Sequence, residues 1–148
     1  MANSEINIKA FLKLIRFAEH KRDDDGVYYI LYGGSTFKDA SKHPNKAMTA
    51  WGHTSTAAGA YQILYRTWKE AFDQKLVSDF TPASQDIIAR HKLKTRKALK
   101  SVEAGNIEDA IGYLRSEWTS LPGAAQSNFS IADARKKFNQ YVAELSIK

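Results

Sequence analysis

Apolar residues return every three or four positions in several stretches of the chain, which is the period of helices that bury one face. The first such stretch runs up to a charged loop and is preceded by Asn7, a candidate N-terminal cap. Its apolar positions are Ile8, Phe11, Leu12, Ile15 and Ala18. The pattern predicts an amphipathic helix over residues 7–20.

Glu19 lies at the polar edge of this apolar stripe, four residues after Ile15. Partial burial disfavours the anionic form of a carboxyl, and the negative end of the helix dipole acts in the same direction. A carboxyl of this kind can protonate the leaving oxygen as a glycosidic bond breaks. The alternative is a solvated residue at the end of the helix, paired with His20 or Lys21.

The segment after this helix has the pattern of a small hairpin. Residues 21–26 form a turn-prone loop, and the β-prone run 27–32 ends at Gly33-Gly34. Residues 35–37 then follow as a possible return strand. The sequence therefore predicts a two-stranded lobe immediately after the Glu19 helix.

Four more helices are expected further along the chain. The block 55–62 opens the second, with Ser55 or Thr56 as its cap and an apolar face from Tyr61 to Phe72. The others run from about residue 84 to residue 99, from a cap at Asn106 towards Leu121-Pro-Gly123, and from a cap at Ser130 through Leu145. We expect a single α+β domain over residues 1–148, mostly helical with a small antiparallel sheet.

Composition removes several classes of chemistry. The chain has no Cys, which excludes disulfides, a thiolate nucleophile and thiolate metal sites. His43, His53 and His91 are too scattered for ligand spacing, so we expect no metal and no cofactor. The N-terminal residues lack the apolar core of an export signal, and no stretch is long and apolar enough to cross a membrane, so we expect synthesis in the cytoplasm.

The net charge of +6 favours an anionic partner such as nucleic acid, a membrane surface or the cell wall. Six basic residues without an intervening acid occur at Arg90, Lys92, Lys94, Arg96, Lys97 and Lys100. They fit a solvated helix face, or a surface attracted to anionic peptidoglycan or outer-membrane lipid. Aromatic residues do not alternate with these charges, so we expect no nucleic-acid partner.

A second carboxylate normally assists glycoside hydrolysis, and the candidates are Asp23, Asp24, Asp25 and Asp39. The three consecutive Asp residues before Gly26 are more typical of a solvated turn. No partner is needed if the substrate provides its own nucleophile. In peptidoglycan, the C6 hydroxyl of muramic acid can attack C1 and close a 1,6-anhydro ring, with one glutamate acting first as acid and then as base.

Several blocks occur in the order typical of one enzyme family. They are Ala10-Phe-Leu12 leading to Glu19, Gly33-Gly34 with Phe37, Asp39 and Ser41 before His43-Pro44, Ser55-Thr-Ala-Ala-Gly-Ala-Tyr-Gln62, Phe80-Thr-Pro-Ala-Ser-Gln-Asp86, and Trp118-Thr-Ser-Leu-Pro-Gly-Ala124. In these blocks the chain resembles the phage lambda endolysin family of soluble lytic transglycosylases. The resemblance implies a lysozyme-like fold with a saccharide cleft between lobes, and it places the catalytic glutamate at Glu19.

The resemblance also implies substrate contacts. Tyr61 and Gln62 match the family's Tyr-Gln pair and would bind sugar near the cleft, although Tyr61 also suits a helix core and Gln62 a solvated amide. Ser55 and Thr56 either touch substrate or cap a helix. Tyr32 either stacks on a sugar ring or packs against another aromatic residue.

The function implied is that of a monomeric endolysin that cleaves the MurNAc–GlcNAc β-1,4 bond without water. It would be made in the host cytoplasm and would reach the wall in the periplasm through a pore-forming holin. The segment Ala47–His53 departs from the family pattern, and its Trp51 is either a sugar platform or a surface residue. The alternatives are a hydrolytic muramidase with a second carboxylate, and a non-catalytic module that binds cell wall or nucleic acid.

Overall fold

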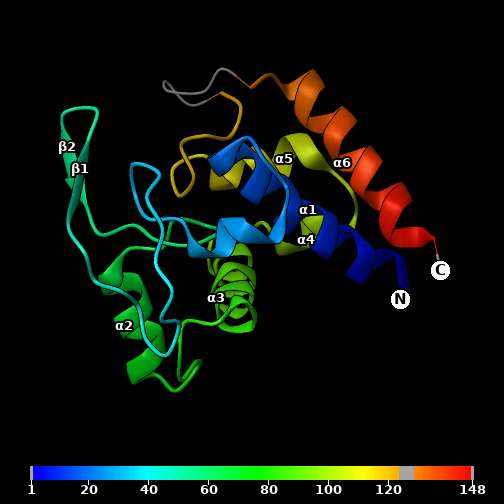
Figure 1. Cartoon of the computed structure of the whole chain (residues 1–148). Coiled ribbons are helices and arrows are strands. Elements are labelled where there is room, and N and C mark those ends of the chain that lie inside the picture. The colour runs from blue at the N-terminus through cyan, green and yellow to red at the C-terminus, as the bar shows by residue number, and fades with distance from the viewer. Residues whose placement is uncertain (1, 124–128, 148) are drawn as a thin grey trace. The chain divides into compact units, whose positions relative to one another are not determined.

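The computed structural model describes residues 2–123 and 129–147, so Ala124, at the end of the block that begins with Trp118, lies outside the described residues. Within these ranges the chain is mostly helical, with one short antiparallel sheet (Figure 1). The elements in chain order are α1 (Ala2–His20), the 3-10 helix η1 (Asp25–Tyr29), β1 (Met48–Ala50), β2 (His53–Ser55), α2 (Tyr65–Asp73), α3 (Pro82–Thr95), α4 (Leu99–Glu103), α5 (Ile107–Leu114) and α6 (Ile131–Ser146).

The chain divides into two compact units. One contains Met1–Lys21 together with Arg90–Lys148, and the other contains Arg22–Ala89. The boundary between the units falls within α3. Its residues up to Ala89 belong to the second unit, and those from Arg90 belong to the first. No helix among the described residues has the length and apolar character that crossing a membrane requires.

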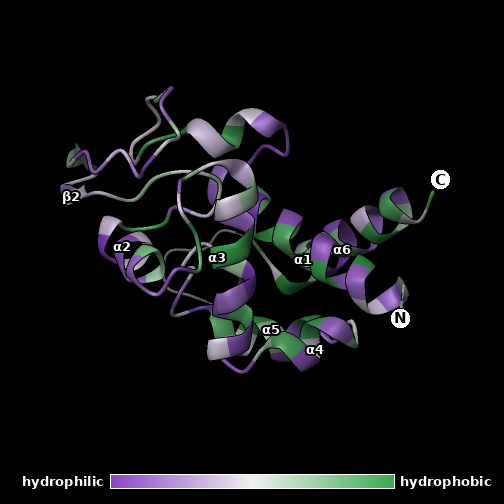
Figure 2. Ribbon diagram, turned by 90° about the horizontal axis from the view of Figure 1, so that it is seen from below, coloured by the Kyte–Doolittle hydropathy of each residue, from purple (hydrophilic) through white to green (hydrophobic). Residues whose placement is uncertain are grey.

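In the first unit, α1 packs against α6 and α4. The buried row of α1 includes Phe11, Leu14 and Ile15, and that of α6 includes Phe138 and Tyr141. Hydrophobic and hydrophilic residues follow one another along these helices, as Figure 2 shows. The apolar period of the sequence therefore marks the faces that build this core.

The first helix begins at Ala2, so the prediction of a cap at Asn7 is wrong. The helix includes the residues before Asn7, so Asn7 lies in its interior. Its side-chain amide donates to the carbonyl of Glu103 at 2.8 Å, which ties α1 to the end of α4. A polar residue that suits a cap serves here as a link between helices.

The predicted caps of the last two helices are confirmed. Asn106 accepts a hydrogen bond from the backbone N–H of Asp109, and Ser130 accepts one from Asp133. The helix that follows Asn106 ends at Leu114, earlier than the predicted end near Leu121. The residues in between form turns, although they still bury apolar side chains.

In the second unit, the predicted hairpin is only partly formed, and the two-stranded sheet lies further along the chain. Residues 25–29 form η1 instead of a strand, and across the Gly33-Gly34 turn a single bridge joins Ile30 to Thr36. The sheet is formed by β1 and β2, joined at Trp51 and Gly52, where φ is 52° and 78°. Positive φ at both central residues suits a tight hairpin turn, but Trp is rare at such a position, so this turn carries no strong signal in the sequence.

The second predicted helix begins too early, because α2 starts at Tyr65 and not near Ser55. Ser55 ends β2, and the chain then turns through left-handed conformations at Gly59 and Gln62, with φ of 84° and 48°. Two bridges hold Ala58, to Leu31 and to Ile63. Long-range pairing therefore overrides the helical pattern of this block.

The helix predicted over residues 84–99 corresponds to α3, which ends at Thr95. Lys97 adopts a left-handed conformation with φ of 66°, and α4 begins at Leu99. The six basic residues between Arg90 and Lys100 therefore do not share one helix face. Three of them form ion pairs: Arg90 with Glu5, and both Lys92 and Arg96 with Glu117.

Candidate active site

Glu19 lies in the last turn of α1, beside the buried Ile15 and Ala18. Ser120, in the turns after α5, donates a short hydrogen bond from its hydroxyl to Oε2 of Glu19. The two residues are 101 positions apart in the sequence and belong to the same compact unit. The carboxyl is therefore held by the tertiary structure and is not a freely rotating group at a helix end.

Burial raises the pKa of Glu19 to about 7. The hydrogen bond from Ser120 and the nearby ammonium of Lys21 both lower this pKa, but they only partly offset the effect of burial. The residue as a whole keeps some solvent-accessible surface, while protein atoms crowd the carboxyl itself, and the carboxyl surroundings decide its ionisation. Near neutral pH both the protonated and the ionised form are populated, as an acid that later acts as a base requires.

Ser120 was not identified as a site residue from the sequence. A serine in a loop carries no local signal, and the residue it contacts lies at the other end of the chain. The family resemblance included Trp118-Thr-Ser-Leu-Pro-Gly in one of its blocks, and this was the only available hint. The structure shows that one residue of that block, Ser120, contacts Glu19.

Two of the four candidate second carboxylates, Asp24 and Asp39, are engaged in local turns. Asp24 pairs through both oxygens with Arg22, at 2.7 and 2.5 Å, and caps η1. This pairing lowers the pKa of Asp24 to about 2. Asp39 accepts a hydrogen bond from the backbone N–H of Ser41 at 2.9 Å, and its contacts with Ser41 lower its pKa. Both fit the interpretation of these residues as turn formers.

Tyr61 lies in the core of the second unit, with no exposed surface. Its hydroxyl donates to Oδ1 of Asp86 at 2.6 Å, and Tyr28 donates to the same oxygen at 2.8 Å. Gln62 is partly exposed, and its amide donates to the carbonyls of Gly59 at 3.0 Å and Ile30 at 3.2 Å. These contacts favour the core role for Tyr61 and a loop-tying role for Gln62.

Ser55 and Thr56 both act on nearby backbone. The Ser55 hydroxyl accepts from the N–H of Ala57 at 3.0 Å. The Thr56 hydroxyl accepts from the N–H of Tyr65, the first residue of α2, at 3.1 Å. Both residues remain partly exposed. The prediction of Ser55 or Thr56 as the N-terminal cap of the second helix is wrong, because the cap position of α2 is Leu64.

Tyr32 and Trp51 form an aromatic pair at the β1–β2 hairpin. Their rings meet edge to face with centroids 5.4 Å apart, and the Tyr32 hydroxyl donates to the carbonyl of Ala50 at 3.2 Å. Trp51 is 78% exposed. Tyr32 therefore packs against another aromatic residue, which is one of its two predicted roles, and the indole of Trp51 remains on the surface.

The described residues contain no group of three or more His, Asp or Glu side chains that could hold a metal ion. His43 is buried, and both ring nitrogens are used: Nε2 lies 2.8 Å from the carbonyl of Ile63, and Nδ1 accepts from the N–H of Asn45 at 2.9 Å. Burial lowers the pKa of His43, which favours the neutral ring. His43 is thus a structural residue of the second unit.

Comparison with known proteins gives consistent matches. The family model described as Endolysin matches residues 9–145. The chain is 37% identical to the endolysin of Escherichia phage lambda over 127 residues, covering 82% of this chain and 80% of that protein. It is 36% identical to the endolysin of Escherichia phage P2 over 137 residues, covering 82% and 83%.

Two solved structures resemble the fold. A bacteriophage lambda lysozyme complexed with a chitohexasaccharide superposes with a TM-score of 0.82 at 34% identity, covering 92% of this chain and 94% of that one. A second lysozyme from bacteriophage lambda gives a TM-score of 0.75 at 31% identity, covering 95% and 92%. The predicted lysozyme-like α+β fold class and the predicted family resemblance are both confirmed. The chain belongs to the endolysin family, enzymes that degrade peptidoglycan.

Proposed function

We propose that this endolysin is a lytic transglycosylase, in which Glu19 acts as the acid and then the base in non-hydrolytic cleavage of the MurNAc–GlcNAc β-1,4 bond. The observation that carries the proposal is a single crowded carboxyl, held by Ser120, whose pKa burial raises to about 7. At the pH of a bacterial periplasm, such a group can both give and take a proton.

The reaction has two steps that balance without water. Protonated Glu19 gives its proton to the glycosidic oxygen as the bond from that oxygen to C1 of muramic acid breaks, which leaves an oxocarbenium-like sugar. Ionised Glu19 then takes the proton from the C6 hydroxyl of the same sugar while its oxygen bonds to C1. The product ends in 1,6-anhydromuramic acid, and the carboxyl is protonated again.

An internal nucleophile is preferred because two of the four carboxylates considered as partners are engaged in turns of their own. Asp24 is paired with Arg22 and Asp39 with the backbone of its own turn. Among the described residues, the charged group that shifts the pKa of Glu19 is Lys21, a cation. A hydrolase of the two-carboxylate type would need a further acid near the sugar.

The remaining expectations follow from this assignment. We propose that the chain acts as one monomeric catalytic domain on the cell wall in the periplasm, after a pore-forming holin has opened the inner membrane. The continuous family match over residues 9–145 supports a single catalytic unit. Tyr32, Ser55, Thr56 and Gln62, which are partly exposed, are the candidate sugar contacts, and buried Tyr61 would support them from the core.

Mass spectrometry of the soluble fragments released from purified peptidoglycan tests the reaction type. We expect the wild type to release fragments ending in 1,6-anhydromuramic acid and Glu19→Gln to release none. Glu108→Gln, which changes an exposed glutamate paired with Arg135, is the matched control and should behave like the wild type. Fragments one water heavier, with reducing muramic ends, would show hydrolysis and overturn the lyase assignment.

A further inference from the structure

The segment 115–121, which carries Ser120, is fixed at its apolar positions. The side chain of Trp118 is 5% exposed, and Leu121 is fully buried. Backbone hydrogen bonds of 2.9 Å run from the N–H groups of Glu117 and Trp118 to the carbonyl of Leu114, and one of 3.0 Å runs from Leu121 to Trp118. The backbone on both sides of Ser120 is therefore held in place.

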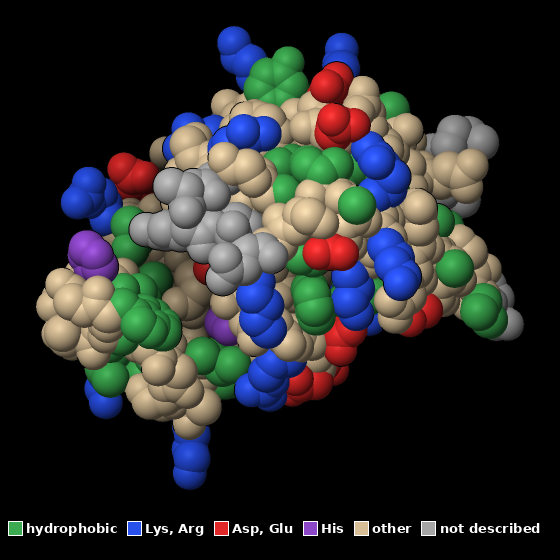
Figure 3. All heavy atoms as spheres, turned by 90° about the horizontal axis from the view of Figure 1, so that it is seen from above, with side chains coloured by type: hydrophobic (Ala, Val, Ile, Leu, Met, Phe, Trp, Pro, Cys, Tyr) green, Lys and Arg blue, Asp and Glu red, His purple; other side chains and the backbone are tan. Residues whose placement is uncertain are grey.

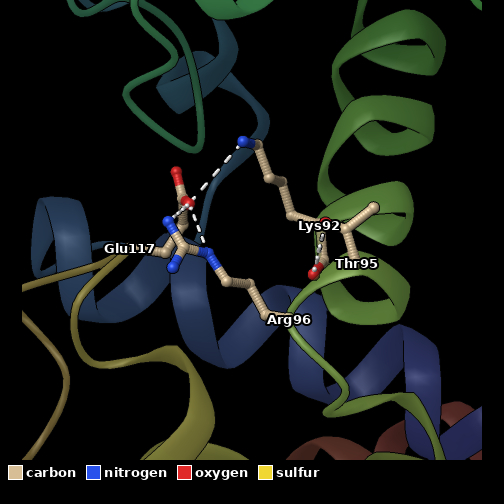
Figure 4. A network of polar contacts seen from close by, with 4 residues as sticks. All are labelled: Lys92, Thr95, Arg96 and Glu117. Carbon is tan, nitrogen blue, oxygen red and sulfur yellow. Dashed lines mark hydrogen bonds and ion pairs between the residues drawn. The ribbon is translucent and has the colours of Figure 1, made fainter.

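An ion network adds a second anchor to the segment (Figure 4). Oε1 of Glu117 accepts hydrogen bonds from Arg96 at 3.0 Å from Nε and 2.8 Å from Nη2, and it lies 3.6 Å from Nζ of Lys92. The Glu117 side chain is only 20% exposed, so solvent screens this pairing less than it does a surface ion pair. The end of α3 thereby holds the residue that stands three positions before Ser120.

The anchored hydroxyl meets one specific oxygen of the acid. Ser120 donates to Oε2 of Glu19, while within the described residues no hydrogen bond reaches Oε1. A carboxyl that accepts a hydrogen bond at one oxygen carries its own proton more readily at the other. The two oxygens of Glu19 are therefore not equivalent.

We propose that Ser120 is the positioning residue of Glu19, holding Oε2 so that Oε1 carries the transferable proton, and that the Arg96–Glu117–Lys92 network keeps Ser120 in place. The proposal rests on the proposed function of Glu19 and adds the residues that orient it. One oxygen then gives the proton to the leaving group and takes the proton of the C6 hydroxyl.

The electrostatics of the unit agree with this role. The Ser120 bond stabilises the ionised carboxyl and so lowers the pKa of Glu19 against the effect of burial. Lys21, at the end of the same helix, acts in the same direction, and His20 is the neighbouring titratable residue on α1. Without the Ser120 hydroxyl, the carboxylate left after the first proton transfer would lose this stabilisation, so Glu19 would give its proton to the leaving oxygen less readily.

The test compares Ser120→Ala, Ser120→Thr and the control Ser116→Ala, which changes an exposed serine of the same segment. The Glu19 pKa is measured by NMR titration of its side-chain carboxyl carbon, without substrate, and kcat and KM are measured across pH. We expect Ser120→Ala to raise the Glu19 pKa, to move the alkaline limb of the kcat profile to higher pH, and to lower kcat about tenfold with little change in KM. Ser120→Thr should restore all three, and Ser116→Ala should match the wild type.

An unchanged Glu19 pKa in Ser120→Ala, or an equal loss of activity at every pH, would overturn the proposal and leave Ser120 a structural residue. Should Ser120→Ala fail to fold, Ser120→Cys keeps the side-chain volume with a weaker donor and takes its place. Because the NMR titration needs no substrate, it decides this proposal independently of the fragment masses that decide the reaction type.

The network is tested by Glu117→Gln alone and combined with Ser120→Ala. Alone, it should move the Glu19 pKa in the same direction as Ser120→Ala, but less. In the Ser120→Ala background it should have no further effect on the Glu19 pKa, because its influence passes through the Ser120 hydroxyl. Additive shifts in the double variant would show that Glu117 acts by another route and would remove it from the proposal.

Discussion

At the scale of single residues, the raised pKa of Glu19, which the proposed reaction requires, lowers the stability of the folded chain at alkaline pH. This pKa is about 7 in the folded chain, against an ordinary value of 4.5. The unfolded chain therefore releases this proton more readily than the folded one. The contribution of Glu19 to stability is fullest below about pH 4.5, and it is lost as pH rises through about 7.

Glu19→Gln should consequently stabilise the protein at alkaline pH. At pH 8 we expect the free energy of unfolding to rise by roughly 1–3 kcal/mol, allowing for the part of the residue that solvent reaches. At pH 4 the difference from the wild type should be small. Urea denaturation at the two pH values measures the effect, with Glu108→Gln as the control, and an identical difference at both would contradict the raised pKa.

At the scale of elements, the segment between β2 and α2 contains a close contact between Gly59 and the side chain of Gln85. A Cβ atom at Gly59 would lie 2.2 Å from Oε1 of Gln85, and Gly59 has a φ of +84°. Gln85 is fully buried and bonds the N–H of Ala60 at 2.9 Å and the carbonyls of Tyr28 and Phe80 at 3.1 and 2.9 Å. The side chain of Gln85 thus joins three segments of the second unit.

Gly59→Ala should therefore destabilise the fold by about 3 kcal/mol or more, since it adds both a clash with a buried amide and backbone strain. Thermal or urea unfolding measures the loss. Gly112→Ala is the contrasting change, because Gly112 lies in α5 with open space around its would-be Cβ, and it should gain about 0.5–1 kcal/mol. A mild effect at Gly59 would mean that Gln85 can move aside.

At the scale of the whole molecule, the positive charge is dispersed. The face in Figure 3 carries Lys and Arg side chains with Asp and Glu side chains among them. Arg90, Lys92 and Arg96 are occupied by internal ion pairs, so the basic stretch contributes less outward charge than its sequence suggests. The net charge of +6, in which these acids are already counted, still attracts an anionic wall at long range.

Degradation of anionic peptidoglycan should therefore weaken with salt. Between about 0.1 and 1 M NaCl the Debye length falls from about 10 to about 3 Å, so we expect KM to rise several-fold while kcat changes little. Turbidity loss of purified walls measures the rates. Binding of a neutral chitooligosaccharide to Glu19→Gln is the control and should respond weakly to salt, whereas an equal response would argue against charge attraction.

The sequence by itself determined the features that depend on neighbouring residues. The helical period of the first and last helices, and the caps at Asn106 and Ser130, follow from contacts within a few positions, and these predictions are confirmed. The same local pattern placed Glu19 beside a buried stripe. Helix periodicity and capping are local interactions, so a single chain displays them without its fold.

Tertiary structure alone decided the features that depend on distant partners. The block after Ser55 has a helical pattern, yet the bridges of Ala58 to Leu31 and Ile63 hold it in another conformation. The predicted strand from residue 27 is likewise replaced at its start by η1, and only the bridge of Ile30 to Thr36 remains of the predicted hairpin. Ser120 can be recognised as a partner of Glu19 only in the folded structure, because the two residues are 101 positions apart in the sequence. A hydrogen bond depends on distance in space and not on position along the chain.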